Sequence, residues 1–545
     1  MSTPDPSRCV FLPCLLASFS VSPLPKETKM SQLQAVWLRA AVVVVLAGTV
    51  SSALATVTWN TLYFQQPVDH FSFVPTSPSL FSQKYLVNDS WWRNDSSNPG
   101  PILFYTGAVS PVFLCQLTAS GNEAPIEAFA AYSGLVWTLA QQVEGVVVFA
   151  EHRYFGSSTP QATSSRSSTE QPFKYLSSEQ ALADYVALIN FLREQYEAAS
   201  QPPPSTCTRS DKCRQVRRVP CIAIGGSYGG ALAAWMRVKY PFTVDGAIAS
   251  SAPQALFGSS ELSTAVAEGI THSFDVDGSG RCPPAIRSSF ESIYQLFGNA
   301  TGRALLTKLF RPCAPFESYS DFPLLYTWLY SGYLSLAQEN WPYPVEFSAF
   351  SGRYIPAWTV NTSCTYFVNS TQSLNTHRQL LLAAKASMDL AYNASQASDG
   401  ASCYNMSQPG YLNNAAFLAL LCTEIVVPQG SSGVHDMFLP NPWNFTAWAD
   451  TCASLLNLTT RPGWTTQHYG GADMSFVSNI LFTNSLLDPW KLGVAALQTA
   501  SSLPMLNYTG GAHTYDLAFP NELDHPSVKQ VRNQELSFIQ SLLKR

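Results

Sequence analysis

The chain has 545 residues, of which 46% are hydrophobic and only 12% are charged, and its net charge is −5. This length exceeds what one compact core accommodates and predicts a chain divided into two parts. The sequence has no basic patch, which argues against a nucleic-acid partner.

The N-terminal segment has the pattern of a secretory signal peptide that begins at Met30. The apolar run is too short to span a bilayer, so no stable membrane span is expected in the mature chain, and a membrane anchor is the poorer alternative. The basic residue, the apolar run and the small residues suited to cleavage are Arg39, 40–47 and 53–55. The leader is therefore placed at 1–55, as an upstream extension, 1–29, followed by the signal peptide, 30–55.

Ten Asn-X-Ser/Thr sequons without proline at X also favour export, because such sequons are glycosylated in the secretory pathway. Most of them lie in the middle of the chain. The predicted glycosylation sites are Asn88, Asn94, Asn299, Asn361, Asn369, Asn393, Asn405, Asn444, Asn457 and Asn507.

The segment around residue 227 predicts a nucleophilic serine. Cys221–Ile224 is an apolar run typical of a buried strand, and 231–239 favours a helix. Between them, Gly225-Gly-Ser-Tyr-Gly229 fits G-x-S-x-G, which between a strand and a helix is a nucleophile elbow. We interpret Ser227 as the nucleophile and the backbone N–H of Tyr228 as an oxyanion-hole donor. The alternative is a glycine-rich turn with an incidental serine.

A serine nucleophile needs a base, and the base needs an acid that orients it. In this fold the acid and then the histidine follow the serine along the chain. Ser478–Asn484 and Leu503–Tyr508 are predicted strands near the C-terminus. Asp488 lies just past the first strand and His513 just past the second, at the edge where the elbow places its serine. The predicted triad is therefore Ser227, Asp488 and His513.

The other histidines and acids have weaker claims to these roles. His152 follows a predicted strand but precedes the serine, with no acid placed after it, so we interpret it as structural. Asp516 and Asp524 come too late for the expected order. The remaining histidines lack a strand-end position and are predicted to be surface or packing residues: His70, His272, His377, His435, His468 and His525.

The interval from Ser227 to Asp488 is far longer than a hydrolase sheet needs. The excess, 259–471, predicts an inserted domain of helices broken by Pro, Gly and Asn turns. The predicted fold is an α/β-hydrolase core, 56–258 and 472–545, with an inserted, mainly helical cap that restricts access to the serine. Predicted cap helices are Glu261–Phe274, Ala285–Phe297, Phe322–Gln338, His377–Asn393 and Asn414–Leu421.

The chain resembles the family of serine exopeptidases that contains lysosomal Pro-X carboxypeptidase, dipeptidyl peptidase II and relatives of the thymus-specific serine protease. The resemblance covers nearly all the chain after the leader, and its motifs are specific in combination. It implies hydrolysis of a peptide bond after proline, near one end of a short peptide, with the triad on the same three residues. The matching segments are 63–71, 104–107, 149–156, 178–184, 225–230, 341–344, 422–424, 436–438, 488–490 and 511–513.

The resemblance also implies three disulfides, Cys282–Cys364, Cys313–Cys403 and Cys422–Cys452. Cys207 and Cys213 share a local loop and are expected to pair with each other. The remaining cysteines beyond the leader are Cys221, predicted to be a buried free thiol, and Cys115, which is not assigned. No C-x-x-C pair and no Cys/His cluster at zinc spacing occurs, so neither a metal nor a cofactor is implied.

Two segments depart from the family pattern. Ala108–Gly121 interrupts a run that in relatives passes straight into Asn122-Glu123, and we interpret it as retained intron sequence or an unusual insertion. The loop it interrupts usually supplies an oxyanion-hole N–H, worth about 3 kcal/mol, so a real insertion would weaken or abolish activity. In the proline pocket the family tryptophan matches Trp490, but flanking methionines are replaced by Ala231 and Val427, which predicts a looser specificity.

The end of the peptide that is cut depends on which terminal charge is bound. A dipeptidyl peptidase needs a carboxylate for the substrate amine, with Glu123, Glu424 and Asp436 as candidates, whereas a carboxypeptidase needs cations, with Arg153, Lys491 and His435 as candidates. Because 429–438 resembles the carboxypeptidase slightly more, we favour a Pro-X carboxypeptidase of the lysosome, vacuole or extracellular space. The alternatives are dipeptidyl peptidase II-like release of X-Pro dipeptides, a lipase or esterase, and an inactive glycosylated binding protein. A homodimer is left open.

Overall fold

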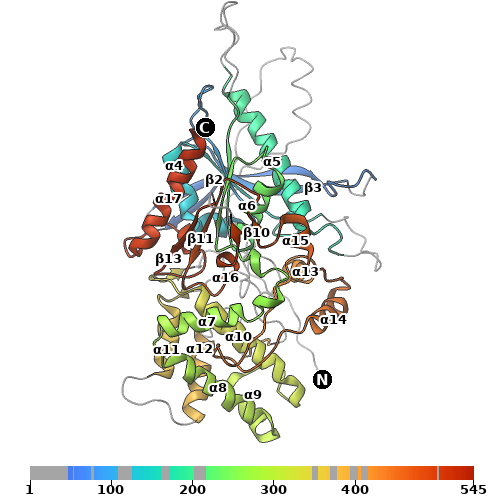
Figure 1. The fold of residues 1–545 in the computed structure, drawn as a ribbon, viewed down its shortest axis with the longest axis vertical. Coiled ribbons are helices and arrows are strands. Elements are labelled where there is room, and N and C mark those ends of the chain that lie inside the picture. The colour runs from blue at the N-terminus through green and yellow to red at the C-terminus, as the bar shows by residue number, and fades with distance from the viewer. Residues whose placement is uncertain are drawn as a thin grey trace, which may run out of the picture. The chain divides into compact units, whose positions relative to one another are not determined.

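The main sheet has nine strands in the order β1-β2-β3-β5-β4-β6-β7-β11-β13, and helices lie on both sides of it (Figure 1). Strands β1, β2 and β3 pair antiparallel, β3 is antiparallel to β5, and every pairing from β5 to β13 is parallel. The strands are β1 (Ala47–Ser52), β2 (Ala55–Pro67), β3 (Leu80–Asn88), β4 (Ile102–Tyr105), β5 (Val146–Ala150), β6 (Cys221–Gly226), β7 (Gly246–Ser250), β11 (Ile480–Ser485) and β13 (Met505–Tyr508).

The structure is a computed structural model that describes part of the chain, all of it in one compact unit, Val45–Arg545. The predicted leader lies outside the described residues except for 47–52 and 55, which belong to β1 and β2. Cys115, Glu123, the 108–121 segment and the Cys207–Cys213 pair also lie outside them. The described residues are 47–52, 55–74, 79–107, 126–160, 172–201, 217–346, 354–368, 377–392, 403–406, 415–499 and 503–544.

Helices cover both faces of the sheet because successive residues of a strand point to opposite sides. In β6, Cys221 and Ala223 pack into the apolar cluster under α5 and α6, while Ile222 and Ile224 pack into the cluster under α3, α4 and α17. A strand buried on both faces must be apolar throughout, which is why β5 reads Val-Val-Val-Phe-Ala. These helices are α3 (Ile126–Tyr132), α4 (Gly134–Val143), α5 (Ser178–Ala199), α6 (Tyr228–Lys239) and α17 (Pro526–Leu543).

The strand order and the elbow after β6 define an α/β-hydrolase fold, as predicted. The C-terminal strands begin two residues later than expected, with β11 at Ile480–Ser485 and β13 at Met505–Tyr508. The helix after the elbow instead begins three residues earlier than expected, directly after Ser227. In a doubly wound sheet, ligands bind beyond the carboxyl ends of the strands, so this edge is where the site is sought.

Between β7 and β11 the chain is mainly helical, and helices α7 to α12 group together in Figure 1. Their buried faces form a separate apolar cluster that includes Phe290, Trp328 and Tyr333. The five predicted helices are present, α10 with the predicted bounds and the other four with shifted ends. Four further helices, α9, α11, α14 and α15, were not predicted. The helices are α7 (Ala265–Val276), α8 (Cys282–Phe297), α9 (Ala300–Phe310), α10 (Phe322–Gln338), α11 (Thr359–Phe367), α12 (His377–Tyr392), α13 (Ala415–Thr423), α14 (Phe445–Leu456) and α15 (Trp464–Tyr469).

Part of this inserted segment packs against the helices that cover the sheet. Phe417 and Leu420 of α13, together with Tyr469 of α15, belong to the apolar cluster under α5 and α6. Tyr469 stacks on Trp235 of α6, with ring centroids 4.2 Å apart and an interplanar angle of 10°. The division at 259 and 471 therefore stays a prediction, and α13 and α15 share a core with the sheet.

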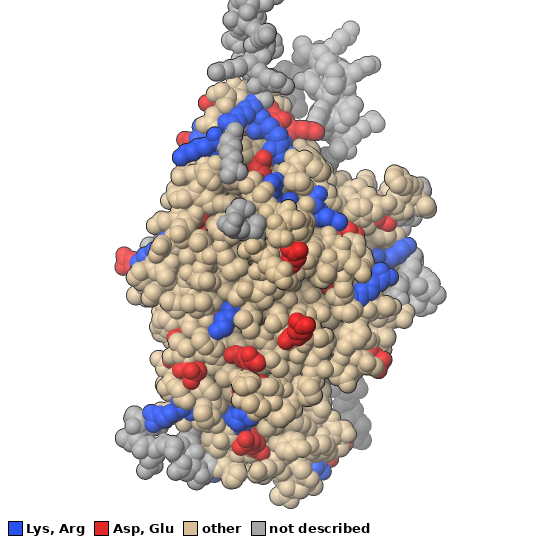
Figure 2. Space-filling model, in the orientation of Figure 1, with Lys and Arg blue, Asp and Glu red and all other residues tan. Residues whose placement is uncertain are grey.

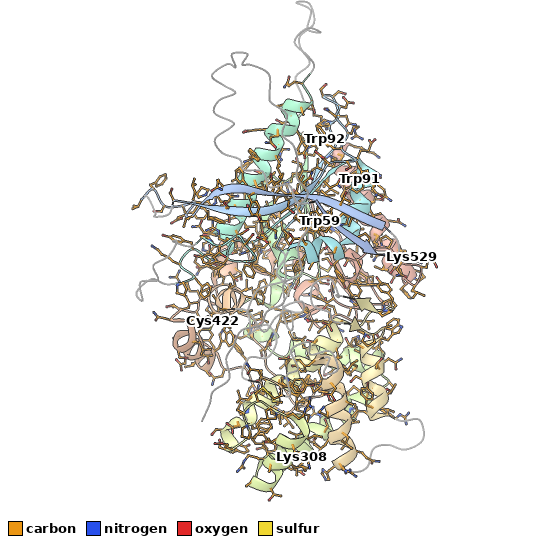
Figure 3. The ribbon with its side chains drawn as sticks, turned by 180° about the vertical axis from the view of Figure 1, so that it is seen from behind. Trp59, Trp91, Trp92, Lys308, Cys422 and Lys529 are labelled. Carbon is orange, nitrogen blue, oxygen red and sulfur yellow. A yellow bond between two sulfur atoms is a disulfide. The ribbon has the colours of Figure 1, made fainter. Side chains whose placement is uncertain are left out.

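Three disulfides crosslink the helical segment. Cys282 bonds to Cys364, Cys313 to Cys403, and Cys422, which Figure 3 labels, to Cys452. These are the pairs that the resemblance implied. Cys221 is a buried free thiol whose pKa burial raises to about 12, so it is unreactive at physiological pH.

Among the sequons in the described residues, every asparagine is exposed to solvent except Asn88. Asn88 is buried at the end of β3, and its amide nitrogen donates a 2.7 Å hydrogen bond to the carbonyl oxygen of Thr58. That nitrogen would carry the glycan, so the structure argues against modification at Asn88. Exposed sequon asparagines are Asn94, Asn299, Asn361, Asn405, Asn444, Asn457 and Asn507, and the predicted sites Asn369 and Asn393 lie outside the described residues.

The surface reflects the low charge content of the chain. On the face shown in Figure 2, basic side chains gather near the top, and the middle and lower parts carry only scattered charged side chains among uncharged residues. Among the described helices, none combines the length and the apolar character needed to cross a membrane.

Candidate active site

Ser227 occupies a sharp turn between β6 and α6. Its φ of 57° and ψ of −129° are unusual for a residue with a side chain, because positive φ is disfavoured outside glycine. The glycines on either side are required by close contacts. A Cβ on Gly229 would lie 2.5 Å from the carbonyl oxygen of Thr106, and one on Gly225 would lie 2.3 Å from that of Gly229. The G-x-S-x-G pattern is thus a steric requirement of this turn.

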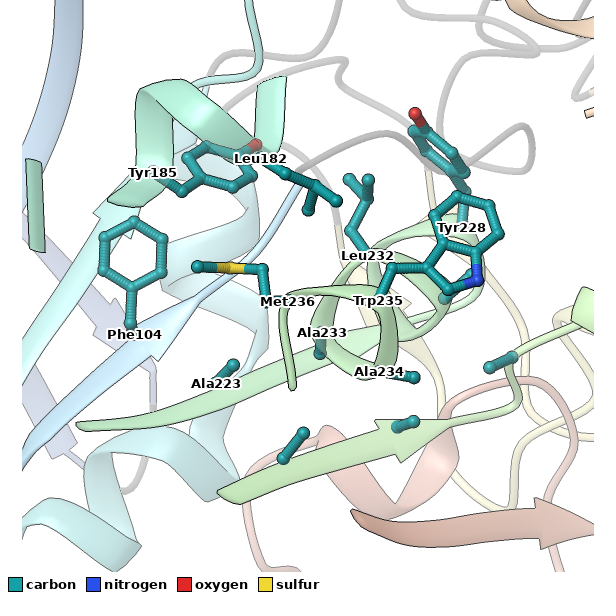
Figure 4. Packing of buried hydrophobic residues seen from close by; sticks show 14 of the residues in the cluster. Phe104, Leu182, Tyr185, Ala223, Tyr228, Leu232, Ala233, Ala234, Trp235 and Met236 are labelled. Atoms are coloured by element: carbon teal, nitrogen blue, oxygen red, sulfur yellow. The ribbon is translucent and has the colours of Figure 1, made fainter. Parts of the chain in front are cut away.

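The packing of α6 holds the turn in place. Leu232 and Met236 of α6 lie against Leu182 and Tyr185 of α5, as Figure 4 shows. On the other flank of α6, Trp235 meets the ring of Tyr228 edge-on, with centroids 6.2 Å apart. The strained serine is therefore anchored by a helix that is buried along most of its length.

The structure brings His513 and Asp488 together as predicted from their strand ends. The Nδ1 of His513 lies 2.8 Å from Oδ2 of Asp488, and both side chains are buried. The Oδ1 of Asp488 accepts a hydrogen bond from the backbone N–H of Trp490 at 2.9 Å, so both carboxylate oxygens are engaged. Among the described atoms, Nε2 of His513 has no hydrogen-bond partner. This arrangement leaves Nε2 able to exchange a proton with a substrate or a nucleophile.

The histidine loop lies against the elbow. A Cβ on Gly226 would lie 2.8 Å from Cγ2 of Thr514, the residue after His513. The N–H of Thr514 donates a 3.0 Å hydrogen bond to Oγ of Ser251, while the N–H of Ser227 donates one of 2.9 Å to the carbonyl oxygen of Ser250. The end of β7 therefore holds the serine and the histidine loop side by side.

The two later aspartates have structural partners instead. Asp516 accepts hydrogen bonds from Ser250, Thr483 and Tyr508, one residue on each of the strands β7, β11 and β13. Asp524 forms an ion pair with Arg532 of α17. Both carboxylates are buried and committed to holding the C-terminal strands and helix, which agrees with their exclusion from the triad.

His152 is also structural in its contacts, but it lies closer to the elbow than the sequence suggested. Burial lowers its pKa to about 4, so it is neutral. Its Nδ1 lies 2.8 Å from the carbonyl oxygen of Arg153, and its Nε2 lies 3.3 Å from the hydroxyl of Tyr228. Arg153 itself is fully buried in an ion pair with Asp184, with Nε 2.7 Å from Oδ2, so it is not free to bind a substrate carboxylate.

An apolar pocket opens beside Ser227. Of the predicted proline-binding residues, Trp490 and Val427 line it, whereas Ala231 is buried inside the core and is not part of the lining. Ser227 and Tyr228, both named from the sequence, also line it. Sequence reasoning missed the remaining lining residues because α13 and its neighbouring segments reach the serine only through tertiary contacts. The full lining is Ser227, Tyr228, Pro253, Phe257, Phe417, Leu421, Ile425, Val427, Gln429 and Trp490.

Tyr228 is the candidate oxyanion-hole donor within the described residues. Tyr228 is the first residue of α6, so its N–H belongs to the unpaired group at a helix N-terminus. The N–H of Gly107, at the end of the β4 strand segment, donates a 3.1 Å hydrogen bond to the hydroxyl of Tyr185. A second donor from the following residues would come from the part of the chain that the structure does not describe.

Two of the three acids proposed for a substrate amine are already engaged. The Oδ2 of Asp436 accepts hydrogen bonds from the backbone N–H groups of Ser432 and Gly433, within its own loop. Glu424 is buried, and its Oε2 accepts hydrogen bonds from both the N–H and the hydroxyl of Ser178, at 2.9 and 2.5 Å. These two acids are therefore poorly placed to receive a substrate ammonium group.

The sequence as a whole agrees with this geometry. Residues 66–535 match the model of the serine carboxypeptidase S28 family. The chain belongs to this family. It is therefore a serine-type peptidase with an α/β-hydrolase fold.

Individual relatives are similar over nearly the whole chain. The lysosomal Pro-X carboxypeptidase of Bos taurus is 34% identical over 486 residues, covering 89% of this chain and 88% of its own. That of Homo sapiens is 34% identical over 488 residues, with coverage of 89% and 88%. Among solved structures, esterase E22 aligns with 88% of this chain and 100% of its own, at a TM-score of 0.36 and 12% identity.

Proposed function

We propose that this peptidase removes the last residue from peptides ending in Pro-X, using Ser227, Asp488 and His513 as its triad. The observation that carries the proposal is the buried His513–Asp488 pair beside a strained serine that borders an apolar pocket. The pocket suits a proline ring, which offers apolar surface and no N–H to satisfy.

In this mechanism Nε2 of His513 takes the proton of the Ser227 hydroxyl as its oxygen attacks the carbonyl carbon of proline. The N–H of Tyr228 stabilises the oxyanion that develops. His513 then returns the proton to the departing amine, leaving an acyl-enzyme that water hydrolyses by the same steps. Asp488 holds the imidazole in the tautomer with a proton on Nδ1 and stabilises its positive charge.

The direction of cleavage is supported by the relatives and by the charges near the site. The bovine and human relatives are Pro-X carboxypeptidases. In addition, Asp436 and Glu424 are engaged by their own surroundings, which removes two of the three acids considered for binding a substrate amine.

We further propose that the peptidase works in the secretory pathway, in the lysosome, in a vacuole or outside the cell. Three disulfides require an oxidising compartment for their formation, and seven described sequons are exposed. The mammalian relatives are named as lysosomal enzymes.

The function is tested with a peptide that carries proline at position two and again just before its final residue. Mass analysis is expected to show loss of the final residue alone, because the substrate carboxylate is bound and its amine is not. The Ser227→Ala protein, prepared in the same way, controls for contaminating peptidases. Release of an N-terminal dipeptide instead would identify a dipeptidyl peptidase.

The width of the apolar pocket leads to a second expectation. Val427 lines the pocket, so Val427→Met should add contacts to a proline ring and exclude bulkier residues. The ratio of kcat/KM for Pro-Phe over Ala-Phe substrates is expected to rise about tenfold. Ala231→Met is the matched comparison, because Ala231 lies in the core and should lower Tm without raising this ratio. An unchanged ratio in Val427→Met would mean that the wall formed by Val427 does not contact the proline.

A further inference from the structure

A second, polar cavity of about 610 Å³ lies between the helical segment and the loop that carries Asp488. Its walls come from α7, the start of α8, the loop 434–437 and the residues that follow Trp490. Four basic side chains line it: His272, Arg287, His435 and Lys491. Two of them, His435 and Lys491, were predicted from the sequence as cations for a substrate carboxylate, and the structure places them in one cavity.

None of these four basic groups forms an ion pair with another residue in the part of the chain that the structure describes. The Nζ of Lys491 donates to the carbonyl oxygen of Leu486 at 3.2 Å, and Arg287 donates to that of Asp436. Both contacts are to neutral oxygens. Within the described residues, these basic groups are therefore not bonded to a carboxylate, although acidic side chains also line the cavity.

Three acids also line the cavity, but two of them are directed elsewhere. The carboxylate of Asp436 accepts hydrogen bonds from its own loop, at the N–H groups of Ser432, Gly433 and Phe438. Glu268 accepts a 2.7 Å hydrogen bond from the hydroxyl of Thr264. Asp275 is the third acid, and it lies near His272 on the same helix. Two of the three acids are therefore already engaged by neighbouring donors.

The polar cavity and the apolar pocket are lined by consecutive residues of one loop. The backbone N–H of Lys491 donates to the carbonyl oxygen of Asp488 at 3.1 Å, so the cation is held by the loop of the triad aspartate. Helix α7 packs tightly on this loop, since a Cβ on Gly269 would lie 2.3 Å from the carbonyl oxygen of Pro489. Trp490 then belongs to the lining of the apolar pocket, and Lys491 and Leu492 belong to the lining of the polar cavity.

We propose that this polar cavity is the subsite that binds a carboxylate group of the peptide, with Lys491, His435 and Arg287 as its donors. The proposal rests on the proposed function, because it makes the cavity part of the same substrate site. The carboxylate has two sources in a peptide, its C-terminus or an acidic side chain. Hydrogen bonds between a cation and a carboxylate are stronger than hydrogen bonds between neutral groups, so these contacts would contribute measurably to the affinity for the peptide.

The test measures binding rather than turnover, so that it does not depend on catalysis. The Ser227→Ala protein, alone or combined with Lys491→Met, is titrated calorimetrically with an N-acetylated peptide that ends in Pro-Phe as the free acid or the amide. A second pair of peptide amides carries glutamate or glutamine before the proline. Lys308→Met is the matched control, because Lys308 is an exposed lysine of α9 that lines neither cavity (Figure 3).

We expect Lys491→Met to weaken binding of the free acid about tenfold and to leave the amide unchanged, while Lys308→Met changes neither. If the cavity instead binds an acidic side chain, Lys491→Met should weaken binding of the glutamate peptide and leave binding of the glutamine peptide unchanged. His435→Gln should also weaken binding of the carboxylate peptide. A loss of affinity in both variants would show that the effect of Lys491→Met does not come from a folding defect of that one protein.

The proposal is overturned if both carboxylate peptides bind the Lys491→Met and His435→Gln proteins as tightly as the parent. Hydrolysis of the same peptides by the protein with Ser227 intact reports separately on the proposed function. If the peptides bind in a carboxylate-dependent way and are not cleaved after proline, the subsite stands and the proposed function fails.

Discussion

Ser227→Ala is expected to lower kcat by about 10⁶-fold and Asp488→Asn by about 10⁴-fold, with little change in Tm. The first substitution removes the nucleophile. The second leaves a neutral amide beside His513 that no longer favours the tautomer with a proton on Nδ1, which the 2.8 Å contact indicates. The measurements are hydrolysis of a Pro-Phe peptide, covalent labelling by a fluorophosphonate, and thermal unfolding of each variant.

Asp516→Asn and His152→Gln are the matched controls for this experiment. Both residues are buried near the site, and Asp516 bonds three strands, so Asp516→Asn is expected to lower Tm. Neither should reproduce the loss of kcat in the fraction that stays folded. If His152→Gln proved as damaging as His513→Gln in a folded protein, the assignment of the base would be wrong.

Glu424→Gln is expected to make the protein more stable above neutral pH. Burial raises the pKa of Glu424 to about 7, against an ordinary value of 4.5, even though hydrogen bonds from Ser178 favour its ionised form. The folded state therefore prefers the neutral acid. The stability that this preference contributes is fully present below pH 4.5 and is lost as the pH rises through about 7.

The size of this effect follows from the two pKa values. Each unit of difference corresponds to about 1.36 kcal/mol, so ionising Glu424 costs the folded state on the order of 3 kcal/mol. Glutamine keeps an oxygen that accepts from Ser178 and does not ionise. The drop in Tm between pH 5 and pH 8 is therefore expected to be smaller in Glu424→Gln than in the parent.

Glu291→Gln, an exposed acid on α8, serves as the control and should leave that drop unchanged. Glu424 follows α13, which lines the apolar pocket, so peptidase activity should fall on the same alkaline limb in the parent and less in Glu424→Gln. An identical pH dependence of Tm in both proteins would show that Glu424 does not titrate in this range.

The candidate triad could be proposed from the sequence because its three residues lie in recognisable local patterns. The turn at Ser227 requires glycines, because a side chain at Gly225 or Gly229 would clash with neighbouring backbone atoms. Asp488 and His513 each follow an apolar strand that the sequence alone reveals. The fold class followed from the same order. Most strand and helix ends could not be predicted, because capping and tertiary contacts decide the last residues of each element.

The apolar pocket could be predicted only in part, for a different reason. Phe417 and Leu421 come from α13, far from Ser227 in the chain, and an apolar helix gives no sign of which cavity it will face. Arg153 was misjudged as a candidate cation for the same reason, since its partner Asp184 lies on α5. The four missed helices are short or begin at residues such as Asn299 and Asn444, whose side chains cap the helix although the sequence there resembles a turn.

The packing of α13 limits how this enzyme could be recombined with its relatives. Phe417, Leu420 and Tyr469 pack in the apolar core under the helix that follows Ser227, although they belong to the last part of the inserted segment. A chimera that exchanged the whole insert would remove these apolar contacts from the helix that follows Ser227. We therefore expect that helices α7 to α12 can be exchanged between relatives as one unit. Helices α13 to α15 must come from the same protein as the sheet, because they pack against it.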